Sequence, residues 1–296
     1  MSKIDLHAHS TRSDGKESVS TVFEEAAAAG VTILALTDHD TTSGWDEAAD
    51  AASRLGIGFV PGIELSTRAH VTDSKGEPRS FGVHMLAYLP NPQHPELVAA
   101  MQSTLEGRVE RLRIMTEMIA EEWFVEWSDV LEQLEAGATY GRPALADALI
   151  QRGHFAQRGE VFDTVWAAGR DYYVPYKGAP DTYDAIELVR AAGGVPVIAH
   201  PMARGKGLPA DGQMPTAHFE EMIARGLAGF EVYHRDVLDF ARQWLTGLAE
   251  KHDLVLTGSS DYHGKAGKPN LLGENTTSRE MLDRILAQAT GTKALI

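Results

Sequence analysis

The chain contains no cysteine among its 296 residues. This absence excludes disulfide bonds and thiolate metal sites, so any bound metal ion must be held by histidine and carboxylate side chains. Such ligands suit manganese, iron or zinc, and magnesium as well. The chain also lacks a run of about 18 apolar residues, which a membrane-spanning helix needs. The first motif begins at Asp5, so we expect no signal peptide, no membrane partner and a cytoplasmic location.

Basic residues are scarce as well. The chain has 27 lysines and arginines against 42 aspartates and glutamates, which gives a formal net charge of −15. A protein that binds long nucleic acid through a basic surface would not have this charge. A small anionic substrate is not excluded, because bound divalent ions reverse the local sign of the electrostatic potential.

Strand and helix patterns alternate over residues 1–90. Residues 31–36 form a continuous apolar run, as expected of a strand that is covered on both faces. This alternation is typical of a parallel sheet or barrel. The predicted strands are 3–6, 31–36, 57–60 and 82–88, and the predicted helices are 19–30 and 43–56.

The alternation stops at Pro90. Residues 95–122 carry apolar side chains at helical spacing and predict one long helix, and three shorter helices follow with no strand between them. Four consecutive helices do not continue a β/α barrel. We therefore predict an inserted helical subdomain over residues 97–178, with residues 1–96 and 179–296 forming the barrel. The shorter helices are expected at 127–135, 142–152 and 157–167; beyond the insertion we expect strands at 195–199, 229–233 and 254–259, and helices at 182–192, 215–225 and 236–251.

Clusters of histidine and carboxylate residues stand at the ends of the predicted strands, where α/β proteins build their sites. His7 and His9 are two residues apart and would point to the same face of a strand. The joint placement of these clusters predicts a metal centre. The candidate ligands are His7, His9, Asp14, His39, Glu64, His84, His200, Asp261 and His263.

Simpler interpretations remain open for several of these residues. Asp14 lies in a Ser-Asp-Gly turn, where aspartate is favoured for local reasons. Asp38 and Asp40 could cap the helix expected at 43–56. His84 lies within an apolar run and could be a buried core histidine. Residues 203–213 are rich in glycine and proline and form a candidate lid beside His200.

Taken together, these motifs resemble the PHP (polymerase and histidinol phosphatase) superfamily of metal-dependent phosphoesterases. The resemblance implies a distorted (β/α)7 barrel with three divalent metal ions at the carboxyl ends of the strands. It implies that a hydroxide bridging two ions is the nucleophile. The implied ligand sets are His7, His9, Glu64 and Asp261 for the first ion, Glu64, His84 and His200 for the second, and Asp14, His39 and His263 for the third.

A Gly-Arg-Pro motif at Gly141–Pro143 is similar to that of the 3′,5′-nucleoside bisphosphate phosphatases, some of which also trim short RNA from its 5′ end. The resemblance implies that Arg142 and Lys177 hold a phosphate opposite the metal ions. Ala144 departs from the pattern, since many relatives carry histidine there. Arg142 also has a simpler interpretation, because Gly-Arg-Pro suits the start of a helix.

Three further features concern the substrate. Tyrosines 172, 173 and 176 near Lys177 could line a base pocket or simply pack. His234 follows a predicted strand and is a candidate proton donor or phosphate ligand, although a histidine at a strand end can also be structural. The other histidines are expected at the surface: His70, His94, His154, His218 and His252.

We therefore expect a metal-dependent phosphoesterase acting on a small phosphorylated substrate, a 3′,5′-nucleoside bisphosphate in particular. A 5′–3′ exonuclease on short RNA and a histidinol-phosphate-type phosphatase are the alternatives within this class. A metal-dependent amidohydrolase fits less well, since we see no lysine at a strand end to bridge metals. A non-catalytic, polymerase-associated barrel would be expected to lack some of the ligands.

Overall fold

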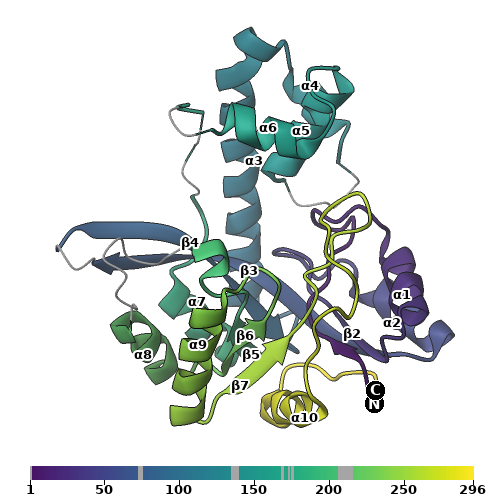
Figure 1. Cartoon of the computed structure of the whole chain (residues 1–296), viewed down its shortest axis with the longest axis vertical. Helices are drawn as coiled ribbons and strands as arrows, with labels where there is room; N and C mark the ends of the chain where they lie inside the picture. The colour runs from purple at the N-terminus through teal and green to yellow at the C-terminus, as the bar shows by residue number, and fades with distance from the viewer. Residues whose placement is uncertain are drawn as a thin grey trace.

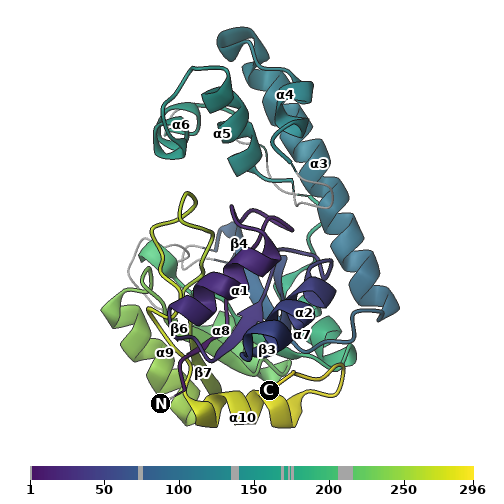
Figure 2. The same ribbon diagram turned by 90° about the vertical axis from the view of Figure 1, so that its right-hand side faces the viewer.

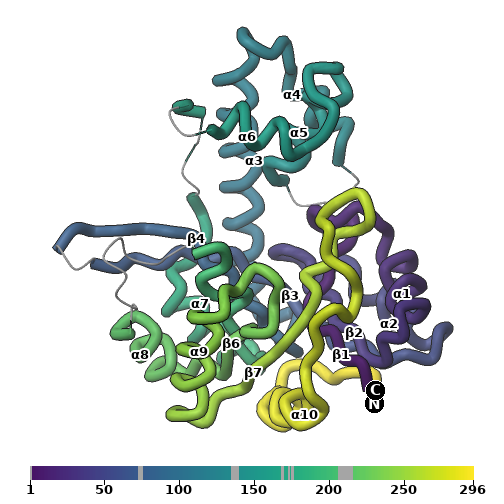
Figure 3. Tube along the Cα trace, in the orientation of Figure 1, coloured from purple at the N-terminus to yellow at the C-terminus, as the bar shows by residue number. Residues whose placement is uncertain are grey.

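The computed structural model describes residues 2–72, 76–134, 140–167, 170–172, 174, 177–205 and 216–296. It shows a distorted α/β barrel with a group of helices held above it (Figures 1 and 2). Both ends of the chain lie on the side of the barrel that is remote from these helices (Figure 3). No helix in the described ranges has the length and apolar character required to cross a membrane.

Seven strands form one sheet in the order of the sequence. The first three strands are parallel to one another, and so are the last three. A parallel bridge between Ala8 and Tyr262 joins the chain after the first strand to the chain after the last, as in a barrel. The strands are β1 (Ile4–Asp5), β2 (Ile33–Leu36), β3 (Gly58–Thr72), β4 (Pro78–Tyr88), β5 (Val195–Ile198), β6 (Gly229–Tyr233) and β7 (Val255–Gly258).

The pairing of β4 corrects two predictions. This strand runs antiparallel to both β3 and β5, so the sheet is mixed and not purely parallel. The strand predicted at 57–60 is too short, because β3 continues beyond it and pairs with β4 from Gly62 to Thr72. This long antiparallel partner supplies the hydrogen bonds that hold residues 61–72 in an extended conformation.

Six helices accompany the strands of the barrel. Ser18 caps the first of them by accepting a hydrogen bond from the Thr21 amide, and Gly56 ends the second in a left-handed conformation, φ 67°. The last helix was not predicted; its Leu282 and Ile285 are buried against strand residues such as Ile4. The helices are α1 (Val19–Ala28), α2 (Trp45–Leu55), α7 (Thr182–Ala191), α8 (Thr216–Ala224), α9 (Asp239–Lys251) and α10 (Arg279–Gln288), with a short 3₁₀ turn at Ala203–Gly205.

The region of the predicted insertion contains four helices, and no strand, among its described residues. Its helices pack around a separate apolar core that includes Leu112, Ile119, Leu145 and Val161. The long helix rises from the barrel, and the three shorter ones lie near its far end (Figures 1 and 2). These helices are α3 (Pro95–Trp123), α4 (Trp127–Leu131), α5 (Arg142–Gln151) and α6 (Arg158–Val165).

Candidate metal centre

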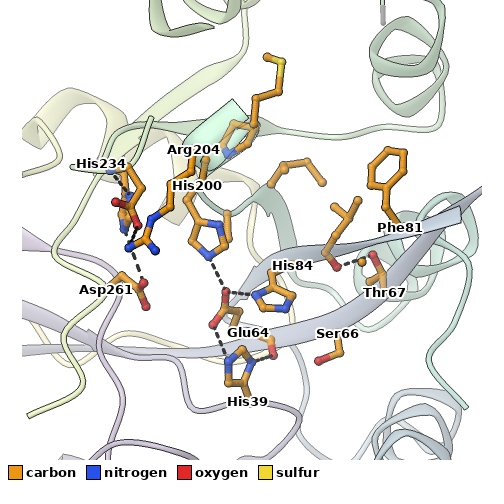
Figure 4. A pocket seen from close by; sticks show the side chains of 18 of the residues that line it. His39, Glu64, Ser66, Thr67, Phe81, His84, His200, Arg204, His234 and Asp261 are labelled. Atoms are coloured by element: carbon orange, nitrogen blue, oxygen red, sulfur yellow. Dashed lines mark hydrogen bonds and ion pairs between the residues drawn. The ribbon is translucent and has the colours of Figure 1, made fainter. Parts of the chain in front are cut away.

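The nine predicted metal ligands come together at the carboxyl ends of the strands. Within the described residues, three groups of histidine and carboxylate atoms lie close enough to hold metal ions, each with its ligand atoms within 4.8 Å of one another. The groups are His7, His9, Glu64 and Asp261; His39, Glu64 and His84; and His9, Asp14, His39 and His263. His200 joins the second group through Glu64, as Figure 4 shows.

The first group has the geometry of a coordination shell. His7 Nε2 lies 3.0 Å from His9 Nε2, 3.2 Å from Glu64 Oε2 and 3.5 Å from Asp261 Oδ1. His9 Nε2 lies 3.0 Å from the same Glu64 oxygen and 3.3 Å from the same Asp261 oxygen. Ligands about 2.1 Å from a tetrahedral ion are separated by about 3.4 Å, so one ion fits between these four atoms.

Glu64 connects two groups through its two oxygens. Its Oε2 lies 3.3 Å from His39 Nε2 and faces the first group, whereas its Oε1 lies 2.9 Å from His84 Nδ1 and 3.1 Å from His200 Nε2. Burial by itself would raise the pKa of this carboxyl group, but the surrounding imidazoles hold the pKa well below its ordinary value. Glu64 is thus a carboxylate placed to bridge two cations.

The third group lies beside the turn that carries Asp14. His263 Nδ1 donates to the Asp261 carbonyl oxygen at 2.9 Å, which leaves its Nε2 as a lone-pair donor. That nitrogen lies 3.1 Å from Asp14 Oδ1. Asp14 therefore does more than form a turn, because its carboxylate and the His263 imidazole face each other in one candidate ligand group.

Unpartnered polar atoms show that the centre fits metal ions. A buried polar group without a hydrogen bond is costly, and native structures rarely tolerate several together. Of the atoms that the structure describes, three on candidate ligands are buried and have no hydrogen-bond partner. They are Asp14 Oδ1, Asp261 Oδ1 and His263 Nε2.

Two aspartates near the ligands hold the loops and do not cap a helix. Asp38 accepts hydrogen bonds from the Ser10 amide at 2.8 Å and the Ser10 hydroxyl at 2.7 Å. Asp40 accepts from the Ser66 amide at 2.8 Å and from Arg108 Nε at 3.1 Å. The N-cap of α2 is Gly44, so the capping interpretation of both aspartates is wrong. His84 is likewise no buried core residue, because its ring is partly exposed and lines the cavity described below.

Backbone strain is concentrated at this edge of the barrel. Asp40, His200 and Asp261 adopt positive φ angles of 52°, 30° and 52°. Residues other than glycine adopt this region at a cost of about 1–3 kcal/mol each, and such residues cluster at functional sites. Here the conformation directs His200 and Asp261 into the centre (Figure 4).

Glu231 is a supporting carboxylate to which our sequence reading gave no role. It is fully buried, accepts a hydrogen bond from His7 Nδ1 at 3.0 Å and accepts another from the His200 amide at 2.9 Å. Burial would raise its pKa, but His7, His234 and His200 lower the pKa to about 2. The bond to His7 directs the lone pair of Nε2 toward the first group. The signal in the sequence was a charged residue between two apolar residues of a buried strand.

We expect Glu231→Gln to weaken metal binding without dismantling the ligand set. The amide can present its NH₂ group to His7 and so favour the wrong tautomer, and loss of such a partner typically lowers metal affinity about 10- to 100-fold. Competition with a chelator measures the affinity. The exposed Glu187→Gln on α7 is the control. Unchanged affinity in Glu231→Gln would contradict the supporting role.

A cavity of about 760 Å³ opens from the metal groups toward the helical insertion. Its described lining includes Arg108 and Arg111 of α3, and Arg142 and Phe162 from α5 and α6. The guanidinium of Arg142 lies 5.3 Å from the centre of the Phe162 ring. The cavity thus has candidate metal ligands on one side and arginines on the other, which is an arrangement for binding phosphate.

Several cationic residues that line the cavity were not predicted from the sequence, and two of them contact residues near the metal groups. Lys268 donates to Asp261 Oδ2 at 2.7 Å, and Arg108 contacts Asp40 and Ser66. Burial disfavours the charge of Lys268, yet Asp261 and Asp14 raise its pKa overall. Lys268 follows the Asp-Tyr-His motif in a glycine-rich loop, and this proximity was a usable signal. Nothing in the sequence distinguishes Arg108 from other helical arginines.

The remaining candidates lie as follows. His234 is buried, lines the cavity and accepts a hydrogen bond from the Asp236 amide at 3.1 Å through Nδ1. Lys177 is exposed and is not among the described residues that line the cavity. Tyr173, Tyr176 and residues 206–213 of the candidate lid lie outside the described residues.

One of the five surface predictions is wrong. His218 is buried because α8 packs it against the barrel, where its Nδ1 and the Tyr183 hydroxyl are 2.7 Å apart. It also lines the cavity. His70 and His154 are exposed as expected, and His94 and His252 are partly buried.

Comparison with known proteins gives a family match and a similar solved structure. The PHP domain family matches residues 5–174 of the chain. A solved structure from Bifidobacterium adolescentis, described as a metal-dependent phosphoesterase, superimposes with a TM-score of 0.87 at 36% sequence identity, over 97% of this chain and 96% of the other.

Three characterised relatives are similar over most of the chain, and their names differ. A 5′-3′ exoribonuclease of Haemophilus influenzae is 33% identical over 276 residues, which is 90% of this chain and 91% of the relative. A phosphoribosyl 1,2-cyclic phosphate 1,2-diphosphodiesterase of Eggerthella lenta is 33% identical over 89% of this chain and 95% of the relative. A 3′,5′-nucleoside bisphosphate phosphatase of Chromobacterium violaceum is 32% identical over 90% of each chain.

Proposed function

The chain belongs to the PHP domain family and is a metal-dependent phosphoesterase, and from this premise we propose that it removes one phosphate from a 3′,5′-nucleoside bisphosphate. The observation that carries the proposal is the cavity with two kinds of anion site. Carboxylates and imidazoles that suit metal ions line one part of it, Arg142 and Arg111 line another, and Arg108 contacts Asp40 beside the metal groups. A substrate with two separate phosphates can use both sides.

We propose three divalent metal ions, manganese, iron or zinc, with magnesium as a further candidate. His7, His9, Glu64 and Asp261 would hold the first; Glu64, His84 and His200 the second; and Asp14, His39 and His263 the third. When bound, such ions polarise the phosphoryl oxygens and make hydroxide available at neutral pH. The shared use of Glu64 by two groups supports ions close enough to act on one phosphate.

The residues around the metal groups are assigned roles in binding and proton transfer. Arg142 would hold a phosphate through a bidentate contact, and Lys177 would add positive charge where the substrate enters. Because His234 Nδ1 accepts a backbone hydrogen bond, the proton of the neutral ring lies on Nε2, 3.6 Å from Asp261 Oδ2. His234 is therefore proposed to donate that proton to the leaving oxygen. Residues 97–178 would form the substrate-recognition subdomain, and residues 1–96 and 179–296 the metal-binding barrel.

A second candidate function is the removal of nucleotides from the 5′ end of short RNA. The similarity to the exoribonuclease of Haemophilus influenzae favours it. The same two anion sites would serve, since a 5′-phosphorylated RNA end also presents two phosphates one nucleotide apart. The formal net charge of −15 argues against long nucleic acid in either case.

We expect the metal-loaded protein to hydrolyse a 3′,5′-bisphosphate with kcat/KM at least about tenfold above that of the matching 3′- or 5′-monophosphate. The unreacted phosphate would contribute binding energy that holds the reacting one in line. The measurement is released phosphate across these substrates, with 5′-phosphorylated dinucleotides and a cyclic ribose phosphate in the same panel. Ala144, which departs from the family pattern, is buried in the apolar core of the helices and is not among the described residues that line the cavity.

Equal turnover of the monophosphate and the bisphosphate would refute the use of two anion sites. Faster turnover of the dinucleotide would favour the exoribonuclease function. Faster turnover of the cyclic ribose phosphate would assign the chain to a different phosphodiester substrate. Each of these outcomes leaves the phosphoesterase class unchanged.

A further inference from the structure

The helices α4–α6 stand over the metal groups without sharing an apolar core with the barrel. Their buried residues pack on one another and on the far part of α3, from Leu112 onward. The apolar clusters of the barrel include Leu97 and Met101 at the base of α3 but no described residue of α4–α6. Apolar packing therefore anchors the base of α3 and fixes the internal shape of the upper helices, but it does not join α4–α6 directly to the barrel. The position of α5 relative to the barrel matters, because Arg142 at the start of α5 lines the cavity.

An ion pair spans the space between the two parts. Lys16, on the barrel side, donates through Nζ to Asp147 of α5. Asp147 also accepts two hydrogen bonds from Arg158 of α6, one from Nε at 2.7 Å and one from Nη2 at 2.6 Å. These side chains are largely shielded from solvent, with exposed fractions of 30% for Lys16, 16% for Asp147 and 21% for Arg158. We call Lys16, Asp147 and Arg158 the latch.

The two cationic partners of Asp147 keep its carboxylate negatively charged. Burial would raise the pKa of Asp147, but hydrogen bonds from Arg158 and Lys16 lower the pKa, so the carboxylate stays ionised near neutral pH. A shielded carboxylate with two cationic partners holds a more definite geometry than an exposed pair.

Both ends of the latch are close to the site. Lys16 is two residues from Asp14, and its amide donates to the His263 carbonyl oxygen at 2.9 Å. On the other side, Asp147 lies five residues after Arg142 on the same helix. The latch thus joins the chain beside two proposed metal ligands, Asp14 and His263, to α5, the helix that begins at the proposed phosphate-binding Arg142.

We propose that the latch sets the distance between Arg142 and the metal centre, so that Lys16 and Asp147 are positioning residues for substrate binding. The kinetic part of this inference rests on the proposed function, because it requires Arg142 to contact substrate. The structural part does not rest on the proposed function. It requires only that loss of the Lys16–Asp147 pair changes the position of α5 relative to the barrel.

The absence of native cysteine allows spin labels to measure how the upper helices are held relative to the barrel. Exposed Asp163 on α6 and exposed Asp50 on α2 can each be changed to cysteine and spin-labelled in the full chain. We expect a narrow distance distribution in the otherwise unchanged protein, and a broader or shifted one when Lys16→Ala or Asp147→Asn is added. Lys16→Arg should restore the narrow distribution. Lys251→Ala, which breaks a Lys–Glu pair between α9 and α8, is the matched control and should change nothing.

Kinetics supply the second test. Lys16→Ala should lower kcat/KM for the bisphosphate by about tenfold, mainly through KM, because misplacing a binding group costs that much or more. In an Arg142→Ala background the same change should have almost no further effect, since both act through one contact. Metal content and thermal unfolding should be unaffected by Lys16→Ala.

An unchanged distance distribution in Lys16→Ala would overturn the latch whatever the kinetics show. Loss of metal in Lys16→Ala would also overturn it, because the effect would then come through Asp14. Wild-type kinetics in Arg142→Ala would instead overturn the proposed role of Arg142 in substrate binding, and the distance measurement would still test the latch.

Discussion

Glu64→Gln should remove more than one metal ion per chain and lower kcat/KM by at least about a thousandfold. The two oxygens of Glu64 face different groups, Oε2 toward His7 and His9, and Oε1 toward His84 and His200. An amide offers one oxygen and places an NH₂ group against imidazole nitrogens or a cation. Metal-ion stabilisation of a transition state is worth several kcal/mol, and about 4 kcal/mol is a thousandfold in rate.

Asp14→Asn is the matched control for this prediction. Asp14 belongs to one group, in which its Oδ1 faces His263 Nε2 at 3.1 Å. We expect this variant to lose no more than one ion per chain. Elemental analysis of purified protein gives the metal content, and thermal unfolding shows whether each variant is folded. Equal metal loss in the two variants would contradict the bridging role of Glu64.

The metal ligands were predictable because strand ends and side-chain types are both visible in a sequence. A buried strand followed at once by Asp38-His39-Asp40 leaves the ionisable groups at the sheet edge, and this holds whether or not the strand lengths are correct. Glu64 shows this, since it follows the strand predicted at 57–60 and yet lies inside β3. Its side chain still reaches the centre, because β3 extends past the end of β2 and Glu64 lies opposite His39, just beyond that end.

The supporting residues were harder to predict because their partners are far away in the sequence. Glu231 contacts His7 across 224 residues, and Arg108 contacts Asp40 across 68. Local patterns carry no information on such pairs. The extent of the β3–β4 hairpin was missed for a related reason: antiparallel pairing stabilises residues 61–72, and the pairing partner is not apparent from either segment alone.

Arg142→Ala should leave the metal content unchanged and lower kcat/KM for the bisphosphate by about 10- to 150-fold. Loss of a charge-assisted hydrogen bond costs about 1.5–3 kcal/mol, which corresponds to that range. No metal loss is expected, because Arg142 belongs to α5 and to none of the described metal groups.

Arg142→Lys should recover only part of the activity. A lysine supplies one point charge and cannot form two parallel hydrogen bonds to phosphate. It also lacks the planar group that lies 5.3 Å from the Phe162 ring centre and 5.6 Å from that of Trp166. The stacking holds the guanidinium in one orientation, so both the binding contact and its pre-organisation are lost.

The control is Arg152→Ala, at the other end of the same helix. Arg152 is exposed and pairs with Asp129 at 2.7 Å within the insertion, so its removal tests a general loss of positive charge on α5. Steady-state kinetics on the bisphosphate and the monophosphates should show a loss of kcat/KM in Arg142→Ala and none in Arg152→Ala. If Arg142 binds the unreacted phosphate, Arg142→Ala should bring the bisphosphate down to the level of the monophosphate and leave the monophosphate nearly unchanged. An equal loss on both substrates would instead place Arg142 at the reacting phosphate.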